Sequence, residues 1–446
     1  MNTETNNFTI LATGVGESVP SATSCSHFIY RAYKFRIYPN AGQRELLARH
    51  SGCCRYVYNH FLEMRDKAYR EDGRHLNYCG TARELSILKG EEETKWLAEV
   101  YSHTLQAELR NLDAAYRNFF HKKGKHPRFH GKHDRQSCTF PDNVKVRDGD
   151  LILPKFKFPL KMKMHRLMKG KIKHAVISRD CIGKYYASII CEEECSYYSK
   201  SSQEVGIDIG IKEMAVCSNG ERISNPKYLE REEKHLKHLQ RQLSKKQKGG
   251  RNRRRVQMKV ARSHMKVANR RSDYIHKFTS RIVRENQTVC IEDLNIKGMQ
   301  SNRHLAKSLG SVSFGEIVRQ LEYKSRWYGR GFVKVGRFYP SSKTCNHCGH
   351  INRGLTLKDR EWVCAECGAE IDRDYNAAMN ILAEGKRILS GCGEHSDDKQ
   401  KGGEAATRVA SKNHGSPTAS ALGISQKGIE NKRAVWYNRE HEIKRG

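Results

Sequence analysis

The sequence is short of acidic residues, of prolines and of long apolar runs. Its 446 residues include 82 Lys and Arg but only 49 Asp and Glu, so the formal net charge is +33, and 9 prolines exclude a proline-rich or collagen-like chain. No apolar run approaches the ~20 residues that a transmembrane helix needs. A surplus of +33 exceeds what solubility requires. We therefore expect a polyanionic partner, and nucleic acid is favoured over a membrane surface because no amphipathic anchor or lipidation motif is present.

A secretory signal is also missing. Residues 1–20 have no basic region before their short apolar stretch, which ends at Glu17. In a chain that is not secreted, the 15 cysteines are expected to be reduced thiols or metal ligands rather than a disulfide framework.

A shift in composition at Gln203 separates two parts of the chain, and periodicity predicts the elements of each. Period-two or continuous apolar patterns predict strands at residues 33–38, 151–158, 172–178, 184–193, 204–220 (two strands), 289–291 and 331–338. Helical spacing predicts helices at residues 41–72, 102–123, 231–284 (with a break at Gly249 and Gly250), 311–330 and 372–385. Strands and helices alternate in the second part, which is typical of an α/β domain.

Basic residues gather in two segments. Loop 121–135 mixes Lys, Arg and His with Phe129, a composition that can grip phosphates and stack a base, and a solvated loop is an equal alternative. Stretch 231–284 has 19 Lys and Arg against three Asp and Glu, and so lopsided a run repels itself unless a polyanion screens it. Phosphate contact is therefore preferred there over a solvated face. The candidate nucleic-acid contacts are Lys34, Arg36, Arg128, Lys132, Arg251, Arg253, Arg254 and Arg255.

Four cysteines have the spacing of a metal site. CNHC (345–348) and CAEC (364–367) form C-x2-C-x15-C-x2-C, and a glycine follows each pair. Two such knuckles suit one tetrahedral zinc ion, with no open coordination position, so the zinc is predicted to be structural. The metal would also supply folding energy to a ribbon too small for a core. Unrelated thiols and a redox dithiol are the alternatives. The predicted ligands are Cys345, Cys348, Cys364 and Cys367.

Three carboxylates stand in unusual positions. Asp208 lies inside an apolar strand, Glu292 and Asp293 end another strand, and Asp374 lies near the start of an apolar helix. A buried carboxylate is costly unless a cation pairs with it. Each case alone is more often a cap or a surface charge, but three cases on alternating strands and helices favour one shared site. Clustered acidic oxygens can hold two Mg²⁺ ions ~4 Å apart, which neutralise charge at both oxygens of a phosphodiester undergoing hydrolysis.

These segments resemble a known family. The split RuvC nuclease of the TnpB family is similar to GIDIGIK (206–212), IEDLNIKGM (291–299) and DRDYNAAMNIL (372–382), with the cysteine ribbon placed before the last. TnpB proteins are transposon-encoded, RNA-guided DNA endonucleases related to type V CRISPR effectors. Further resemblance lies in RAYKFRIYPN (31–40), LQAELRNLDAAYRNFF (105–120) and GRFYPSSKTCNHCG (336–349).

The resemblance implies an α/β and α+β multidomain fold. An RNase H-like (RuvC) nuclease domain with an inserted four-cysteine zinc ribbon would accompany an oligonucleotide-binding-like wedge β-barrel that carries a helical recognition lobe. The expected parts are a flexible extension (1–29), the wedge (30–40 and 125–203), the recognition lobe (41–124), the RuvC domain (204–340 and 370–390, with a basic helical insertion at 231–284), the ribbon (341–369) and a disordered tail (391–446).

The resemblance also implies an enzyme, a metal-dependent RNA-guided DNA endonuclease. Asp208, Glu292 and Asp374 match the catalytic acids and would bind two Mg²⁺ ions, in preference to Asp293 and Asp372. The chain would bind a structured guide RNA, read a short motif in double-stranded DNA, form an R-loop and cut both strands, with base pairing supplying most of the specificity. We expect a monomer in the prokaryotic cytoplasm, associated with the nucleoid.

Three alternatives stay open. A compact type V CRISPR-like effector that uses a CRISPR RNA would keep the same protein chemistry. A nuclease-inactive nucleic-acid-binding regulator is disfavoured because all three acids are present. A transposase that joins DNA ends is disfavoured by the ribbon between the second and third acids.

Overall fold

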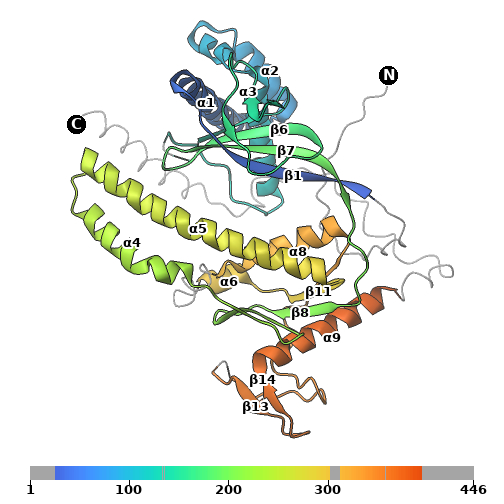
Figure 1. The fold of residues 1–446 in the computed structure, drawn as a ribbon. Coiled ribbons are helices and arrows are strands. Elements are labelled where there is room, and N and C mark those ends of the chain that lie inside the picture. The colour runs from blue at the N-terminus through green and yellow to red at the C-terminus, as the bar shows by residue number, and fades with distance from the viewer. Residues whose placement is uncertain (1–25, 133, 135, 302–311, 357, 394–446) are drawn as a thin grey trace, which may run out of the picture. The chain divides into compact units, whose positions relative to one another are not determined.

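An antiparallel five-stranded sheet forms the base of the N-terminal half in the computed structural model, which describes residues 26–132, 134, 136–301, 312–356 and 358–393 (Figure 1). The strand order is β2-β6-β7-β1-β5. The bounds are β1 Ser26–Ile37, β2 Gln136–Phe140, β5 Met162–Lys163, β6 Lys171–Arg179 and β7 Tyr185–Ser196, and a separate hairpin pairs β3 Lys145–Arg147 with β4 Asp150–Ile152.

Strand β1 alternates as its sequence predicts. Tyr33, Phe35 and Ile37 are buried, whereas Lys34 between them is exposed. The strand starts at Ser26, so residues 26–29 belong to the sheet and not to the expected flexible extension, whose first 25 residues lie outside the described part of the chain. The predicted strand 151–158 ends at Ile152, because Pro154 has no N–H for a ladder.

Helices pack against this sheet. They are α1 Ala41–Asp72, α2 Tyr78–Leu88, the 3₁₀ helix η1 Glu92–Glu99 and α3 Ser102–Phe120. Helix α1 begins with a reciprocal cap, in which Asn40 and Gln43 each accept a hydrogen bond from the other's backbone N–H. Leu105 and Leu109 of α3 share one apolar cluster with Phe35 of β1. The apolar stripe of the predicted helix 102–123 is therefore core packing.

A second five-stranded sheet, of mixed direction, forms the C-terminal half. Its strand order is β10-β9-β8-β11-β12; β8, β11 and β12 run parallel, while β9 and β10 are antiparallel to their neighbours. The bounds are β8 Glu204–Asp208, β9 Glu213–Cys217, β10 Arg222–Ser224, β11 Thr288–Glu292 and β12 Gly331–Val335. Parallel neighbours require long crossover connections, which the helical segments between these strands provide.

Helices cover both faces of the second sheet (Figure 1). Their bounds are α4 Tyr228–Ser244, α5 Arg251–Glu285, α6 Ile296–Ser301, α8 Phe314–Tyr328 and α9 Arg373–Gly393. Val205 and Ile207 of β8 pack with residues of α5 and α8 in one apolar cluster. The chain passes from α4 to α5 at Gly249 and Gly250, where the basic helical stretch was predicted to break. Residues 391–393 end α9, and the rest of the expected disordered tail lies outside the described residues.

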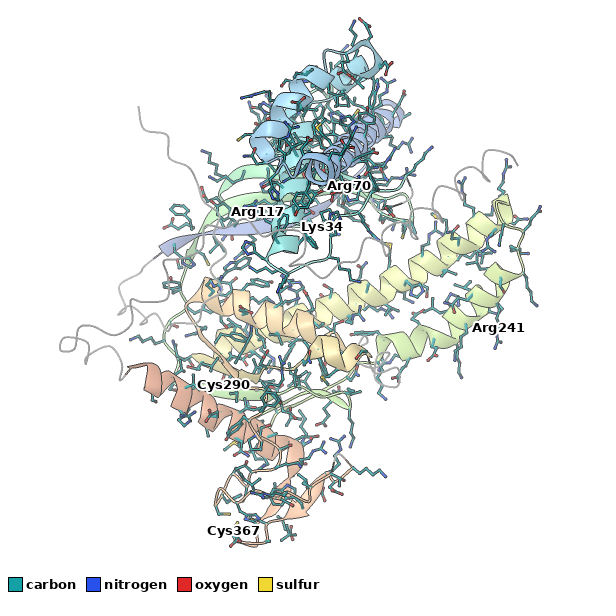
Figure 2. All side chains as sticks on the ribbon, turned by 180° about the vertical axis from the view of Figure 1, so that it is seen from behind. Lys34, Arg70, Arg117, Arg241, Cys290 and Cys367 are labelled. Carbon is teal, nitrogen blue, oxygen red and sulfur yellow. The ribbon has the colours of Figure 1, made fainter. Side chains whose placement is uncertain are left out.

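Helix α9 lies in direct contact with the second sheet, on the face opposite to the one that α5 and α8 cover. A Cβ atom added to Gly206 would stand 2.2 Å from the carbonyl oxygen of Ala378, and one added to Gly385 would stand 2.3 Å from Sγ of Cys290, which Figure 2 labels beside α9. Both glycines therefore permit an approach that a side chain would block. This close packing fixes the start of α9 relative to β8 and β11.

A two-stranded ribbon precedes α9. It pairs β13 Glu361–Val363 with β14 Glu370–Asp372. The whole architecture is mixed α/β, in agreement with the sequence. Within the described residues, no helix is both long and apolar enough to cross a membrane.

Candidate carboxylate site and four-cysteine metal centre

Two of the predicted acids end neighbouring parallel strands. The register pairs Ile207 of β8 with Ile291 of β11. Asp208 and Glu292 each follow directly, at the carboxyl ends of the two strands, and adjacent strands lie ~4.8 Å apart. The topology therefore places two residues that are 84 positions apart in the sequence side by side.

Alternation along β11 puts Glu292, and not Asp293, on the face that α9 covers. Cys290 contacts α9, and Glu292 lies two positions further along the same strand. The N–H of Asp293 donates to the carbonyl oxygen of Val335, and its carboxylate pairs with Arg337 at 3.1 Å. Asp293 thus has its own structural partners next to the carboxylate site.

Asp374 lies in the first turn of α9, and two arginines hold it. Arg360 donates from Nη1 to both carboxylate oxygens, at 2.8 and 3.1 Å, and Arg373 donates from Nη2 at 2.9 Å. Asp372 has a different task, because its carboxylate accepts from the N–H of Tyr375 at 2.8 Å and so caps the helix.

The charges of the other two acids act on Asp208. Burial, with the negative charges of Asp374 and Glu292, raises the pKa of Asp208 to about 7. Burial, with the neighbouring charge of Asp293, also raises the pKa of Glu292. A carboxylate destabilised in this way is one that binds a cation favourably. The structure therefore brings Asp208, Glu292 and Asp374 into one acidic site.

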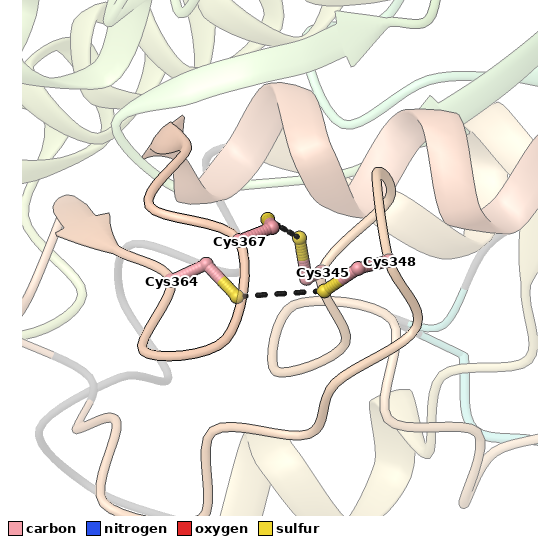
Figure 3. A group of neighbouring side chains, drawn as sticks. All are labelled: Cys345, Cys348, Cys364 and Cys367. Carbon is pink, nitrogen blue, oxygen red and sulfur yellow. Dashed lines mark hydrogen bonds between the residues drawn. The ribbon is translucent and has the colours of Figure 1, made fainter.

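The four predicted cysteines form a tighter cluster (Figure 3). Sγ of Cys345 lies 3.7 Å from Sγ of Cys367, and Sγ of Cys348 lies 3.6 Å from Sγ of Cys364. Tetrahedral ligands at ~2.3 Å from a zinc ion stand ~3.8 Å apart, so the thiols already have the spacing of such a site. Within the described part of the chain, this is the one group of three or more potential metal ligands whose ligand atoms lie within 4.8 Å of one another. The three carboxylates are more widely spread.

The two halves of the cysteine cluster have the same local geometry. Gly349 donates its N–H to the carbonyl oxygen of Cys345, and Gly368 does the same to Cys364, each at 2.9 Å. Both glycines have positive φ, 79° and 70°, which a side chain would strain. Backbone hydrogen bonds from Cys367 lower the pKa of the Cys364 thiol, whereas the pKa values of Cys348 and Cys367 are raised, so the negative charge of the cluster is concentrated on Cys364.

Two buried asparagines join the cysteine cluster to the helix that carries Asp374. Asn376 accepts from the N–H of Asn346 at 2.9 Å and donates to the carbonyl oxygen of Thr344 at 2.7 Å. Asn380, one turn later, donates to the carbonyl oxygen of Ser341 at 2.7 Å. The segment that enters the first knuckle is therefore bound along one face of α9.

A cavity of about 2490 Å³ has many basic side chains in its wall. Four of the predicted nucleic-acid contacts line it: Lys34, Arg36, Lys132 and Arg254. Sequence reasoning missed the other Lys and Arg side chains in the wall, which are spread over several elements: Arg31, Lys163, Arg166, Arg179, Arg319, Lys324 and Arg326. Tyr186 also lines it, with Lys34 Nζ 4.8 Å from its ring centroid. A basic cavity with aromatic rings suits a nucleic-acid strand.

The other predicted nucleic-acid contacts do not line the cavity, and they are of two kinds: three are exposed on the surface, and one holds two helices together. Arg128, Arg251 and Arg255 are exposed and are absent from the cavity wall. Arg253 donates to the carbonyl oxygens of Leu243 at 2.6 Å and Lys246 at 3.0 Å, so it ties the end of α4 to the start of α5. The run of arginines in the sequence gave no sign of this role, because it depends on the chain reversing between the helices.

Arg360 and Arg373 were also missed as members of the acidic site. Arg373 is adjacent to Asp374 and could have been considered from the sequence. Arg360 lies on the far side of the second knuckle, and the hairpin that returns it was not predicted.

Comparison with known proteins shows what the chain is similar to. The model of a probable transposase family, OrfB of IS605, matches residues 188–303, and models described as a Cas12f1-like TNB domain and a helix-turn-helix domain match residues 314–381 and 29–74. The chain is 41% identical to a protein of Streptomyces pristinaespiralis over 82% of this chain and 92% of that protein, and 32% identical to InsQ of Escherichia coli K12 over 82% and 94%. The name assigned to both relatives is RNA-guided DNA endonuclease.

A solved structure was also found. A cryo-EM structure of a Cas12f1–sgRNA–target DNA complex contains a chain with a TM-score of 0.49 and 15% identity, covering 80% of this chain and 99% of that one.

The fold and its sites define an α/β protein with an acidic site at one sheet edge and an adjoining four-cysteine centre. The identities of 41% and 32% to these two relatives, over most of this chain and of each relative, show the family. The chain belongs to the TnpB family, that of the OrfB protein of IS605, as its sequence motifs predict.

Proposed function

We propose that this protein is an RNA-guided DNA endonuclease whose cutting site is formed by Asp208, Glu292 and Asp374. The observation that carries the proposal is the convergence of these three acids, from two strand ends and one helix start, at one sheet edge. The relatives from Streptomyces pristinaespiralis and Escherichia coli support the endonuclease activity, because both carry the name RNA-guided DNA endonuclease. The basic cavity and the charge of +33 support nucleic-acid partners.

The acidic site fits divalent metal ions. Its donors are hard carboxylate oxygens, which Mg²⁺ prefers, and burial together with the negative charges of Asp374 and Glu292 raises the pKa of Asp208. Their ligand atoms do not all lie within 4.8 Å of one another, and we assign two ions to the site, as in two-metal sites that clamp both oxygens of a phosphodiester. When bound, Mg²⁺ supplies charge neutralisation at the attacking and leaving oxygens of the phosphodiester.

The residues of the chain itself would orient this chemistry. Asp208 and Glu292 are fixed by the sheet, so their carboxylates keep their positions without help from mobile loops. Arg360 and Arg373 pair with Asp374 in the structure, and they would hold that carboxylate at the site until metal and substrate arrive. The four cysteines fit one structural Zn²⁺ by their donor type and spacing.

We assign the remaining parts by the same reasoning. The second sheet with α9 would be the RuvC domain of RNase H-like fold (204–340 and 370–390), residues 341–369 its zinc ribbon, and 231–284 its basic insertion. The first sheet would be the wedge, and α1 to α3 the recognition lobe. The protein would bind guide RNA and a short DNA motif, form an R-loop and cut both strands, acting as a monomer in the prokaryotic cytoplasm.

The function is tested by changing the guide. RNA that co-purifies with the protein is sequenced, its targeting segment is replaced, and plasmids that match the old or the new segment are incubated with the complex and Mg²⁺. Cleavage should follow the new segment and should need the metal, because base pairing carries the specificity. Cleavage that ignores the guide would contradict the proposal. The same sequencing distinguishes an RNA from a transposon end from a CRISPR RNA, and a complex that binds its target without cutting would indicate a nuclease-inactive regulator.

The basic insertion gives a further prediction. Replacing the exposed Arg251, Arg254 and Arg255 together by Gln should weaken guide-RNA binding and flatten its salt dependence, by about 0.9 in the slope per lost phosphate contact. Filter binding at several salt concentrations measures both quantities.

The matched control neutralises three cations that already have acidic partners. Lys67, Lys95 and Arg147 pair with Glu71, Glu92 and Asp148 on the surface, so their replacement by Gln should leave the slope nearly unchanged. An equal effect of both triple variants would mean that only total charge matters, and no effect of either would make the insertion a solvated face.

A further inference from the structure

Phe338 presents an aromatic ring to solvent in an unusual way. Its side chain is 94% exposed, more than any other large apolar side chain among the described residues. It occupies a turn that begins just after β12, in which the N–H of Tyr339 donates to the carbonyl oxygen of Gly336 at 3.0 Å. An exposed Phe gains nothing from burial in the folded chain, so the whole face of its ring is accessible to a binding partner.

The residues on both sides of Phe338 are anchored. Arg337 donates from Nη2 to the carboxylate of Asp293 at 3.1 Å and from Nε to the carbonyl oxygen of the same residue at 3.3 Å. Tyr339 packs against the apolar cluster of Val335 and Ile381. The ring is therefore held outward by a fixed turn, and it is not the tip of a loose loop.

This turn lies beside the acidic site. Asp293, which Arg337 binds, directly follows Glu292, and its N–H donates to Val335 at the end of β12. The chain then continues from Phe338 to Ser341, whose carbonyl oxygen accepts from Asn380 of α9. Phe338 thus stands on the segment that links the Glu292 edge of the sheet to the helix carrying Asp374.

We propose that Phe338 is a stacking platform for an unpaired nucleobase of the DNA strand that enters the acidic site. This inference rests on the proposed nuclease function and deepens it. Every base offers a π-face, so an exposed aromatic ring binds single strands without regard to sequence, as guided cleavage requires. A second copy of the chain is a poor occupant, because each copy carries a charge of +33.

The test compares Phe338→Ala with Phe338→Trp in the complete guide–protein complex. Single-turnover cleavage should fall roughly tenfold or more for Phe338→Ala, the order of effect that losing one base stack produces, and should stay near the original rate for Phe338→Trp. Guide-RNA binding and the melting temperature should not change, because the ring has no packing role. Leu389→Ala is the matched control, since Leu389 is an exposed large apolar side chain near the end of α9, about four turns away from Asp374, and its loss should leave cleavage unaltered.

A fluorescence experiment reads stacking without cleavage. Single-stranded DNA with 2-aminopurine at successive positions is bound to Asp208→Asn protein, and stacking on Phe338 should quench at least one position, an effect that Phe338→Ala removes. Unchanged cleavage together with unchanged fluorescence in Phe338→Ala would overturn the inference. If the unaltered complex fails to cut DNA, the proposed function fails, while the fluorescence still decides whether Phe338 stacks.

Discussion

Replacing Asp208 by Asn should abolish guided DNA cleavage, with a loss of at least about a thousandfold in rate, and should leave guide-RNA binding nearly intact. A thousandfold corresponds to ~4 kcal/mol of transition-state stabilisation, which is in the range that a catalytic metal supplies. Asn keeps the shape of Asp but lacks the charge that holds Mg²⁺. Glu292→Gln and Asp374→Asn should have the same effect, because all three carboxylates form one site. Cleavage under single-turnover conditions and RNA binding by filter assay measure the two outcomes.

The chain offers a matched control next to two of these acids. Asp293→Asn and Asp372→Asn remove a carboxylate one or two positions away, and cleavage should persist in both. Asp293 pairs with Arg337, and Asp372 caps α9 through the N–H of Tyr375. Asp372→Asn should therefore cost at most ~1 kcal/mol of stability, since Asn is also a good cap. Cleavage that survives Glu292→Gln but is lost in Asp293→Asn would move the site to the other face of β11.

Loss of the zinc site should have the second largest effect. Cys364→Ser should lower the zinc content from about one ion per chain to near zero, and guided cleavage should fall at least about tenfold. The ribbon has only a small core of its own, including Trp362 and Ile371, so metal binding would supply its folding energy. An unfolded ribbon would also release Arg360 and the segment bound by Asn376, both of which contact the start of α9.

Elemental analysis, cleavage and proteolysis together measure this outcome. Trypsin should cut the ribbon (341–369) faster in Cys364→Ser than in the unaltered protein. Cys79→Ser is the control, because Cys79 is exposed on α2 and lies outside the cysteine cluster. Full cleavage activity in protein shown to lack zinc would contradict a structural role for the metal.

Much of the architecture follows from local patterns. Helical spacing predicts the helix over 41–72 with the bounds that the structure has, and the observed Asn40 cap and the left-handed Gly73 that ends the helix agree with this pattern. The position of the acids within strands is also informative. Because side chains alternate along a strand, Glu292 and Asp293 are expected on opposite faces of the sheet, and only one of them can face the other two acids. The spacing of the four cysteines in the sequence is sufficient to predict that they form one cluster.

What could not be predicted depends on tertiary contacts. The short helices α2 and η1 were missed, since neither has a long periodic pattern. The sequence predicts Arg253 as one more exposed cation. In the structure it donates to the carbonyl oxygen of Leu243 in α4, a contact that exists because the chain reverses between α4 and α5. Arg360 reaches Asp374 across a hairpin of the ribbon. The basic cavity collects side chains from both halves of the chain, and no single segment reveals it.

The central claim is that the three acids gather divalent ions beside the phosphodiester to be cut. Locating Mn²⁺ by anomalous scattering, in crystals of the complex with guide RNA and uncleaved DNA, tests it most directly. We expect two ions bound by oxygens of Asp208, Glu292 and Asp374, next to a phosphate of the DNA. Crystals that contain the DNA but hold no ion at these carboxylates would contradict the account.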